Sequence, residues 1–201
     1  MTTKLLSALF FFTTAFVFAQ SKVFFSEYIE GSSNHKALEI YNGTDSTINL
    51  FAEEIVVQVY SNGNANPGTA VRLRGLLEAG KVFVFAHQQF GLTVPAGTIN
   101  QRDTTTALNW YNGDDAIVLR KGGAIGQILD VIGQIGFRPT GGAWVNNGVS
   151  TLDMTLRRKP WITQGDANGA DSFDPSVEWL AFPQNNVDDL GKFSPVPLGS
   201  P

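Results

Sequence analysis

The sequence predicts an all-β fold, a β-sandwich made by a single domain, and three observations support it. Short runs rich in β-branched and aromatic residues recur along the chain, Gly and Asn clusters separate these runs, and no stretch keeps a helical period over several turns. The 201 residues, of which 43% are hydrophobic, suffice for one domain with its own core. The absence of cysteine excludes a disulfide scaffold, a thiolate metal site and a cysteine nucleophile.

The first segment is typical of a secretory signal peptide. A basic start with Lys4 precedes an apolar run that is shorter than the roughly 20 residues that a membrane-spanning helix needs. Val17 and Ala19 supply the small residues that a signal peptidase requires before Gln20. We therefore expect residues 1–19 to be removed, which changes the net charge from −4 to −5. The mature protein is expected to be secreted, extracellular or periplasmic, without a membrane span.

The expected strands follow one another along the chain. Residues 23–29 form the first, and in residues 36–41 Leu38 and Ile40 share one face because side chains alternate along a strand. Asn42-Gly43 then marks a turn, since both residues tolerate a positive φ. Three further runs with this character are residues 55–60, 70–73 and 82–86.

The clearest hairpin joins residues 116–121 to residues 124–131 through Gly122-Gly123, a pair that two-residue primed turns favour. Alternation and side-chain size also predict a buried core, with the strand residues on one face of their strands. Its predicted members are Leu38, Ile40, Val57, Val59, Val84, Ile117, Leu119 and, outside these strands, Trp144. We expect the domain to span residues 20–192 and residues 193–201 to form a proline-rich tail, extended or disordered.

Four blocks carry a resemblance to a known family over nearly the whole mature chain. They are residues 25–42 (FSEYIEGSSNHKALEIYN), 112–119 (NGDDAIVL), 130–133 (DVIG) and 155–160 (TLRRKP). In their order and spacing they resemble the lamin tail domain family, in its bacterial secreted form. The resemblance implies an immunoglobulin-like β-sandwich, which agrees with the strand prediction.

The resemblance also implies a role. In bacteria this domain often precedes a nuclease or phosphatase domain of a secreted protein, as an accessory module. In animal lamins the related domain binds partner proteins and, weakly, DNA. The residues after the fourth block leave no room for a catalytic domain, so we expect no activity of that kind here.

Acidic residues near the predicted strands have a functional and a structural interpretation. Glu27, Glu30 and Glu39 lie close to the first two strands, where paired carboxylates can do acid–base or metal chemistry. We favour the structural interpretation, in which Glu39 orders a neighbouring loop by accepting backbone hydrogen bonds. Asp114 and Asp115 likewise fit a turn better than a cation site, because adjacent side chains on an extended chain point apart.

The candidate metal site is a polar loop near the C-terminus. Asp166, Asn168 and Asp171 supply hard oxygen ligands at short spacing, as in part of a calcium loop. Ala170 stands where the fifth ligand belongs, and Glu178 falls one place too late to be the bidentate ligand. We expect the side chains to accept hydrogen bonds from backbone N–H groups, with calcium as the alternative and no other cofactor.

Histidines and basic residues give weaker signals. His35 and His87 have neither a metal-ligand spacing nor a G-x-S-x-G context, which argues against a zinc site and a hydrolase triad. Arg157 and Arg158 alternate to opposite faces, so they do not form one clamp for a nucleic acid, and an acidic protein gains little from counterion release. The resemblance implies a structural arginine in this block, paired with an acid such as Glu39. The other basic residues considered for a patch beside Trp161 are Arg120, Lys121, Arg138 and Lys159.

The sequence therefore predicts a non-catalytic extracellular binding or adhesion module of lamin-tail type, with no catalytic residues. Its partner is expected to be a protein, a glycan or a surface rather than nucleic acid, and the mature protein to be a monomer. The alternative is an accessory or minimal metal-dependent extracellular nuclease or phosphodiesterase component. Such an enzyme needs several carboxylates that converge on one or two metal ions, whereas the acids here are dispersed over turns.

Overall fold

The computed structural model describes residues 21–68, 70–104 and 110–196. The predicted signal peptide, residues 1–19, and the end of the predicted tail, residues 197–201, lie outside the described residues. Helix is limited to a 3-10 turn, η1 (Ser61–Gly63), and α1 (Pro175–Glu178) within these ranges. No helix in the described part of the chain is long and apolar enough to cross a membrane.

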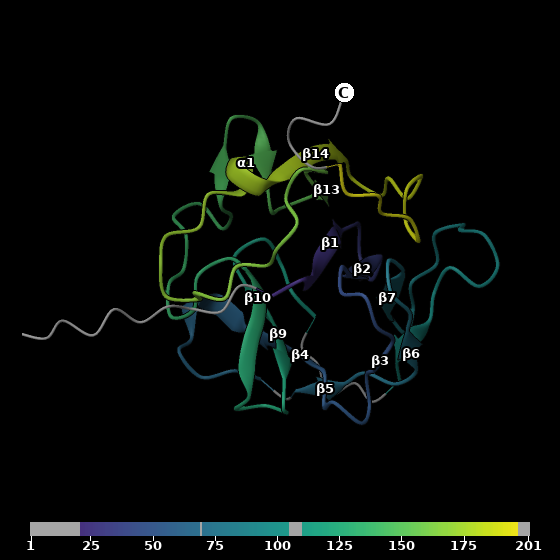
Figure 1. Cartoon of the computed structure of the whole chain (residues 1–201). Coiled ribbons are helices and arrows are strands. Elements are labelled where there is room, and N and C mark those ends of the chain that lie inside the picture. The colour runs from purple at the N-terminus through teal and green to yellow at the C-terminus, as the bar shows by residue number, and fades with distance from the viewer. Residues whose placement is uncertain (1–20, 69, 105–109, 197–201) are drawn as a thin grey trace, which may run out of the picture.

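A six-stranded sheet forms one layer of the fold (Figure 1). In spatial order its strands are β14 (Trp179–Pro183), β13 (Met154–Arg158), β1 (Val23–Glu30), β2 (Lys36–Asn42), β7 (Val82–His87) and β8 (Gln101–Asp103). All neighbours are antiparallel except β7 and β8, which are parallel. β13, from a distant part of the chain, therefore lies between β14 and β1.

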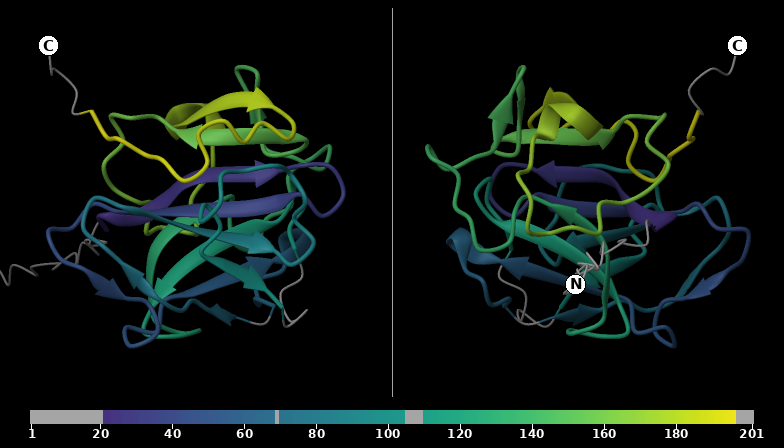
Figure 2. Two further views of the ribbon diagram at one scale, coloured as in Figure 1. Left: turned by 90° about the vertical axis from the view of Figure 1, so that its right-hand side faces the viewer. Right: turned by 60° about the vertical axis from the view of Figure 1, so that its left-hand side comes forward.

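A four-stranded sheet forms the second layer, seen behind the first in the left view of Figure 2. Its strands, in spatial order, are β10 (Gln127–Ile132), β9 (Ala116–Lys121), β4 (Val56–Tyr60) and β5 (Val71–Arg72). Two short hairpin-like pairs complete the described elements: β3 (Ile48–Asn49) with β6 (Leu76–Leu77), and β11 (Val145–Asn146) with β12 (Val149–Ser150). The predicted all-β sandwich is confirmed.

Both sheets are covered on both faces. The largest apolar cluster lies between the sheets and includes Leu38, Val57 and Ile117. A second cluster covers the outer face of the six-stranded sheet and a third the outer face of the four-stranded sheet. Every residue of β1 and β2 is consequently buried, although side chains on these strands point alternately to two sides.

All eight residues predicted to be buried are buried, but they do not share one face. The prediction of one face is wrong for Val84, which lies opposite Glu39 in the outer cluster, while its neighbours Phe83 and Phe85 face the core. Trp144 packs in the third cluster, on the far side of the other sheet. Continuous apolar runs reflect burial on both faces here, so alternation alone does not identify the inner face.

The predicted two-residue turn between β9 and β10 is wrong in length. Gly122 and Gly123 do adopt positive φ values of 85° and 81°, but β10 begins only at Gln127, which pairs with Lys121. The N–H groups of both glycines donate to the carbonyl groups of Glu53 and Glu54, in a neighbouring loop. A tertiary contact therefore lengthens the connection.

The C-terminal segment that follows β14 returns over the outer face of the six-stranded sheet, at the right of the sheet in Figure 1. Leu190 is buried in the outer cluster, and Val187 packs against it. Phe193, with which the predicted tail begins, packs its ring on Phe24 and Tyr41 at centroid distances of 5.8 and 4.9 Å. This segment forms one wall of the site described next.

Candidate functional site

A row of charged side chains crosses the middle of the outer face of the six-stranded sheet. In the strand register Glu27 on β1 lies between Glu39 on β2 and Arg157 on β13. A β-bulge between Phe25 and Glu27 inserts Ser26 into β1, and the Ser26 hydroxyl donates a 2.6 Å hydrogen bond to Glu39 Oε1. The bulge therefore brings an additional polar side chain to the two glutamates.

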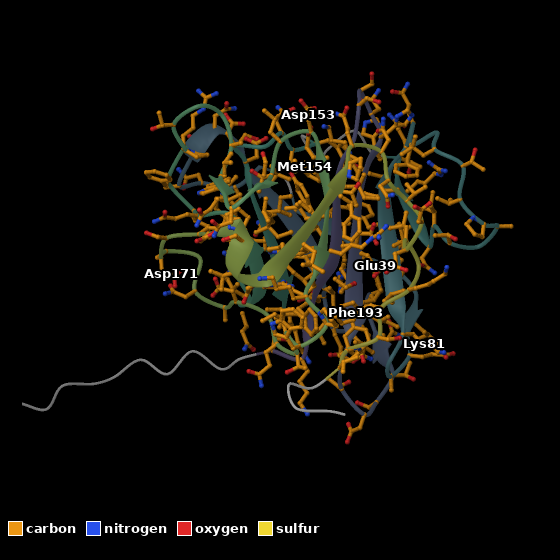
Figure 3. The ribbon with its side chains drawn as sticks, turned by 90° about the horizontal axis from the view of Figure 1, so that it is seen from above. Glu39, Lys81, Asp153, Met154, Asp171 and Phe193 are labelled. Atoms are coloured by element: carbon orange, nitrogen blue, oxygen red, sulfur yellow. The ribbon has the colours of Figure 1, made fainter. Side chains whose placement is uncertain are left out.

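Ser26 and Glu27 line a cleft of about 420 Å³ between the sheet and the C-terminal segment. Leu180 and Phe182 of β14 line it on the strand side, and Phe193 on the side of the C-terminal segment. Figure 3, which looks down on β14, shows Glu39 and Phe193 on the same side of this strand. The cleft thus combines buried polar groups with apolar walls.

Glu27 is the least satisfied charged group of the row. Its side chain is buried, and Oε1 lies 3.5 Å from Arg157 Nε, at the outer limit of a hydrogen bond. Burial and the neighbouring Glu39 carboxyl raise the pKa of Glu27 to about 8, and Arg157 limits the rise. Near neutral pH this side chain therefore holds a proton unless a positive charge arrives.

Glu39 is buried as well, but its two carboxyl oxygens have partners. Oε1 accepts the Ser26 hydroxyl, and Oε2 accepts the backbone N–H of Gly191 at 2.6 Å. Burial raises the pKa of Glu39 to about 7, although these hydrogen bonds lower it. The expectation that Glu39 orders a loop through backbone hydrogen bonds is confirmed, and the loop is the C-terminal segment.

Arg157 lines the cleft from β13, between Glu27 on β1 and Leu180 on β14. Its guanidinium stacks on the Phe182 ring at 4.0 Å, and Nη2 donates to the Asn186 side-chain oxygen. The resemblance implied a structural arginine in this block, paired with an acid such as Glu39. Arg157 and Arg158 do pair with acids, but Glu39 is not one of their partners. Glu27 lies between Arg157 and Glu39 in the register and takes the contact instead.

Arg158, the next residue, points to the other side of β13 and is completely buried. It forms ion pairs with Asp130 and Glu178, donates through Nε to the Phe25 carbonyl at 2.9 Å, and stacks on the Trp179 ring. Asp130 also accepts hydrogen bonds from the backbone N–H groups of Phe25 and Asp166. This inner pair connects the two sheets, and the predicted separation of the two arginines onto opposite faces is confirmed.

A second cleft, of about 380 Å³, is lined by Arg72, Arg74 and Arg102. Two of these guanidinium groups already donate hydrogen bonds to backbone carbonyl groups: Arg72 to Phe51 and Arg102 to Phe90. Arg74 stacks on the Phe51 ring. The Glu27 cleft is the stronger candidate, since it contains a buried carboxyl group with an oxygen that makes no hydrogen bond within the described residues.

Comparison with known proteins assigns the family. The model of the Lamin Tail Domain matches residues 17–136, more than half of the chain. The chain belongs to the lamin tail domain family. No curated protein matches it.

The family match agrees with the observed immunoglobulin-like β-sandwich, and the family is one of non-catalytic domains. The matched span contains β1, β2 and the strands through β10. β13, β14 and the C-terminal segment lie outside it, and they supply Arg157, Phe182 and Phe193 to the cleft. The cleft therefore combines the matched part of this lamin tail domain with the part that follows it.

The acids of the segment Asn112–Asp115 are used within the fold. Asp115 accepts hydrogen bonds from the backbone N–H groups of Asn62 and Asn112, at 2.7 and 2.8 Å. Asp114 pairs with Arg138 at 2.6 Å. The turn interpretation of this segment agrees with these contacts, because each acid serves a different neighbour.

The remaining first-strand acid and the two histidines lie at ends of strands of the six-stranded sheet. Glu30 forms an ion pair with Lys36 and accepts the backbone N–H of Asp153 at 2.5 Å. His35 contacts the Ser32 hydroxyl at 3.3 Å, and His87 Nδ1 accepts the backbone N–H of Gln89 at 3.0 Å. Burial lowers the pKa of His87. These contacts give each residue a local structural role.

The candidate calcium loop lies away from the cleft, and Figure 3 places Asp171 on the opposite side of β14 from Glu39. Asp166 accepts the backbone N–H of Asn168 at 2.8 Å, and Asn168 accepts that of Ala170 at 3.3 Å. Asp171 is exposed. No group of three or more His, Asp or Glu side chains that could hold a metal ion occurs within the described ranges.

Sequence reasoning missed two features of the site. The inner partner of Arg158 is Asp130, whose only signal was an acid within the apolar run 128–132. Glu39, Glu27 and Arg157 form a row because of the strand register and the bulge in β1. The spacing of these residues along the sequence reveals neither feature. An insertion of one residue changes which side chains share a face.

Proposed function

We propose that this lamin tail domain is a non-catalytic extracellular binding module and that it binds a partner protein at the Glu27 cleft. The observation that carries the proposal is a buried, incompletely partnered carboxyl group in a cleft with aromatic walls. The large majority of buried polar side-chain groups in native structures are hydrogen-bonded. A vacant position of this kind is typical of a site that a ligand completes.

The surface around the cleft supports a protein partner. Leu180 and Trp161 are large apolar side chains that are 39% and 40% exposed, and Val196 is exposed beside them. Pro160 connects them, because it lines the cleft, precedes Trp161 and accepts the backbone N–H of Val196. Exposed aromatic and aliphatic groups next to a charged centre are the usual composition of a protein interface.

The extracellular location rests on the predicted signal peptide, residues 1–19. Intact mass of the exported protein tests that part of the proposal. A mature chain that begins at Gln20 is expected, and retention of the first 19 residues would contradict it.

Site-specific photocrosslinking in the cells that produce the protein tests the binding surface. Leu180→benzoylphenylalanine places the crosslinker beside the cleft, and Ile125→benzoylphenylalanine places it in the β9–β10 connection at the other end of the molecule (Figure 1). Ile125 is 98% exposed, so it is the matched control. We expect a discrete adduct with one protein from position 180 only. The same adducts from both positions, or none from position 180, would contradict the proposal.

A plasmid-nicking assay with added magnesium and calcium tests the non-catalytic part. The proposal expects no nicking above a buffer control. Nicking that depends on a divalent ion and disappears in Glu39→Gln would favour the nuclease interpretation instead.

A further inference from the structure

The Glu27 carboxyl group has one oxygen available to a ligand. The residue is 1% exposed, and Arg157 approaches Oε1 at 3.5 Å. No hydrogen bond joins Oε2 to a residue in the described part of the chain. Oε2 is nevertheless not a fully enclosed atom, since Trp179 Nε1 is the enclosed side-chain atom without a partner among the described residues, so Oε2 is open to the cleft that Glu27 lines. A carboxylate that is largely removed from water pays a desolvation cost, which a proton or a ligand with a positive charge reduces.

Acidic groups around this oxygen outnumber basic ones. Glu39 faces Glu27 from β2, Asp189 faces it from the C-terminal segment, and Arg157 faces it from β13. Lys192 lines the same cleft. Arg158 adds no free positive charge, because Asp130 and Glu178 neutralise it on the other side of the strand. Three carboxyl groups therefore share two basic side chains.

The walls of the cleft suit an apolar stem. Leu180 and Phe182 lie on the β14 side, and Phe193 lies on the side of the C-terminal segment. A ligand with a methylene stem and one positive head group would fill both the apolar and the acidic part. The lysine side chain has this form, since it buries its stem on apolar surfaces and carries a compact ammonium group.

We propose that the cleft binds the side chain of a lysine presented by the partner polypeptide, with its ammonium group at Glu27 Oε2. This inference rests on the proposed function and names the group that the module recognises. The ammonium group has three donors, and the side-chain acceptors that line the cleft are Glu27, Asp189, Ser26 and Ser194. Arginine fits less well, because its planar fork needs both oxygens of a carboxylate and Arg157 already engages Oε1.

Lysine binding at this position releases a proton. The pKa of Glu27 is about 8 in the free protein, so an incoming ammonium displaces the proton of the carboxyl group. The affinity therefore rises as the pH increases from about 6 to about 8. Glu39 has a pKa of about 7, so its loss of a proton over the same pH range also raises the affinity for lysine. The other charged side chains around Glu27 are Arg157 on β13 and Asp189 and Lys192 on the C-terminal segment.

Calorimetric titration of the purified protein tests the inference with Nα-acetyl-lysine N-methylamide as the probe. The uncharged norleucine analogue has the same stem without the ammonium group, and the arginine analogue tests the choice of cation. We expect binding of the lysine probe to be at least about tenfold tighter than that of either analogue, and to tighten from about pH 6 to about pH 8.

Two variants locate the site, and one matched variant controls for charge. Glu27→Gln replaces a protonated carboxyl by a neutral amide and is expected to weaken binding at least about tenfold. Leu180→Lys adds a competing ammonium group at an exposed position on the cleft and is expected to weaken it also. Asp188→Asn removes an exposed acid outside the cleft and is expected to leave binding unchanged. The folded state of each variant is checked by its melting temperature.

Equal affinity for the lysine and norleucine probes, no detectable lysine binding, or unchanged binding in Glu27→Gln would overturn the inference. A crosslinked adduct at position 180 without lysine recognition would leave the proposed function in place. The absence of both the adduct and the lysine binding would contradict the two proposals together.

Discussion

Arg157 and Arg158 are neighbours in the sequence, yet they serve two regions of the molecule that differ in how completely charges are paired. Arg158 lies between the sheets, where two carboxylates and a backbone carbonyl accept its hydrogen bonds. Arg157 lies on the outer face, where its contact with Glu27 is long and one carboxyl oxygen has no described partner. A fully paired buried ion pair stabilises one arrangement of the fold, whereas an incompletely hydrogen-bonded carboxyl group beside a cleft is available to a ligand.

The largest expected effect is the loss of the inner pair. Arg158→Ala leaves Asp130 as a buried charge without its guanidinium partner and should reduce the free energy of unfolding by about 3–5 kcal/mol. Denaturant unfolding measures this change. Arg158→Lys keeps the charge but not the planar guanidinium group. Its free energy of unfolding should lie between those of Arg158→Ala and the wild type. A loss below about 1 kcal/mol in Arg158→Ala would show that the inner pair does not hold the sheets together.

A second expected effect concerns the dependence of stability on pH. Glu27 has a folded-state pKa of about 8 and an unfolded-state pKa near 4.5, so between these values the folded state holds a proton that the unfolded state has lost. Its contribution to stability is present below about pH 4.5 and is lost as the pH rises through about 8.

Glu27→Gln should therefore lose less melting temperature than the wild type between pH 5 and pH 8.5. Melting curves at several pH values measure the difference. Asp188→Asn, an exposed position on the C-terminal segment, should follow the wild type. Parallel curves for Glu27→Gln and the wild type would contradict the raised pKa.

Removal of the outer arginine should cost much less than removal of the inner one. Arg157→Ala loses a stacking contact with Phe182, a hydrogen bond to Asn186 and a long ion pair. Glu27 can remain protonated without the arginine. We expect a decrease of about 1 kcal/mol in the free energy of unfolding. A decrease equal to that of Arg158→Ala would remove the distinction between the two regions.

An expected effect of the same small size lies in the loop that the sequence predicted as a candidate calcium site. Asp166→Ala removes one hydrogen bond to the backbone of Asn168 and should cost about 1 kcal/mol, with or without calcium. Asp171→Ala, at an exposed position, should change stability little. A melting shift that depends on calcium and disappears in Asp166→Ala would establish the metal site instead.

The fold was more predictable from the sequence than the cleft. Runs such as residues 82–86 predict strands because β-branched and aromatic residues fit a buried sheet, and β7 occupies this segment. The roles of Glu39 and Asp166 as acceptors of backbone N–H groups were also predictable, since such bonds are local preferences of these side chains.

The cleft could not be predicted, because it depends on pairings between distant segments. β1 pairs with β13, and a bulge at Ser26 sets which side chains face outward. The C-terminal segment covers the outer face, which is why Val84 is buried away from the predicted core. Local patterns carry no information on any of these three features.

The state of the Glu27 carboxyl group in the free protein tests the central claim most directly. A titration of its side-chain carboxyl carbon by ¹³C NMR measures the pKa without a mutation and without a ligand. An incompletely paired carboxyl, held beside Glu39 and served only by a distant Arg157, should titrate at about 8. A pKa at or below the ordinary value of 4.5 would mean that Arg157 pairs fully with Glu27, and that the outer region is as complete as the inner one.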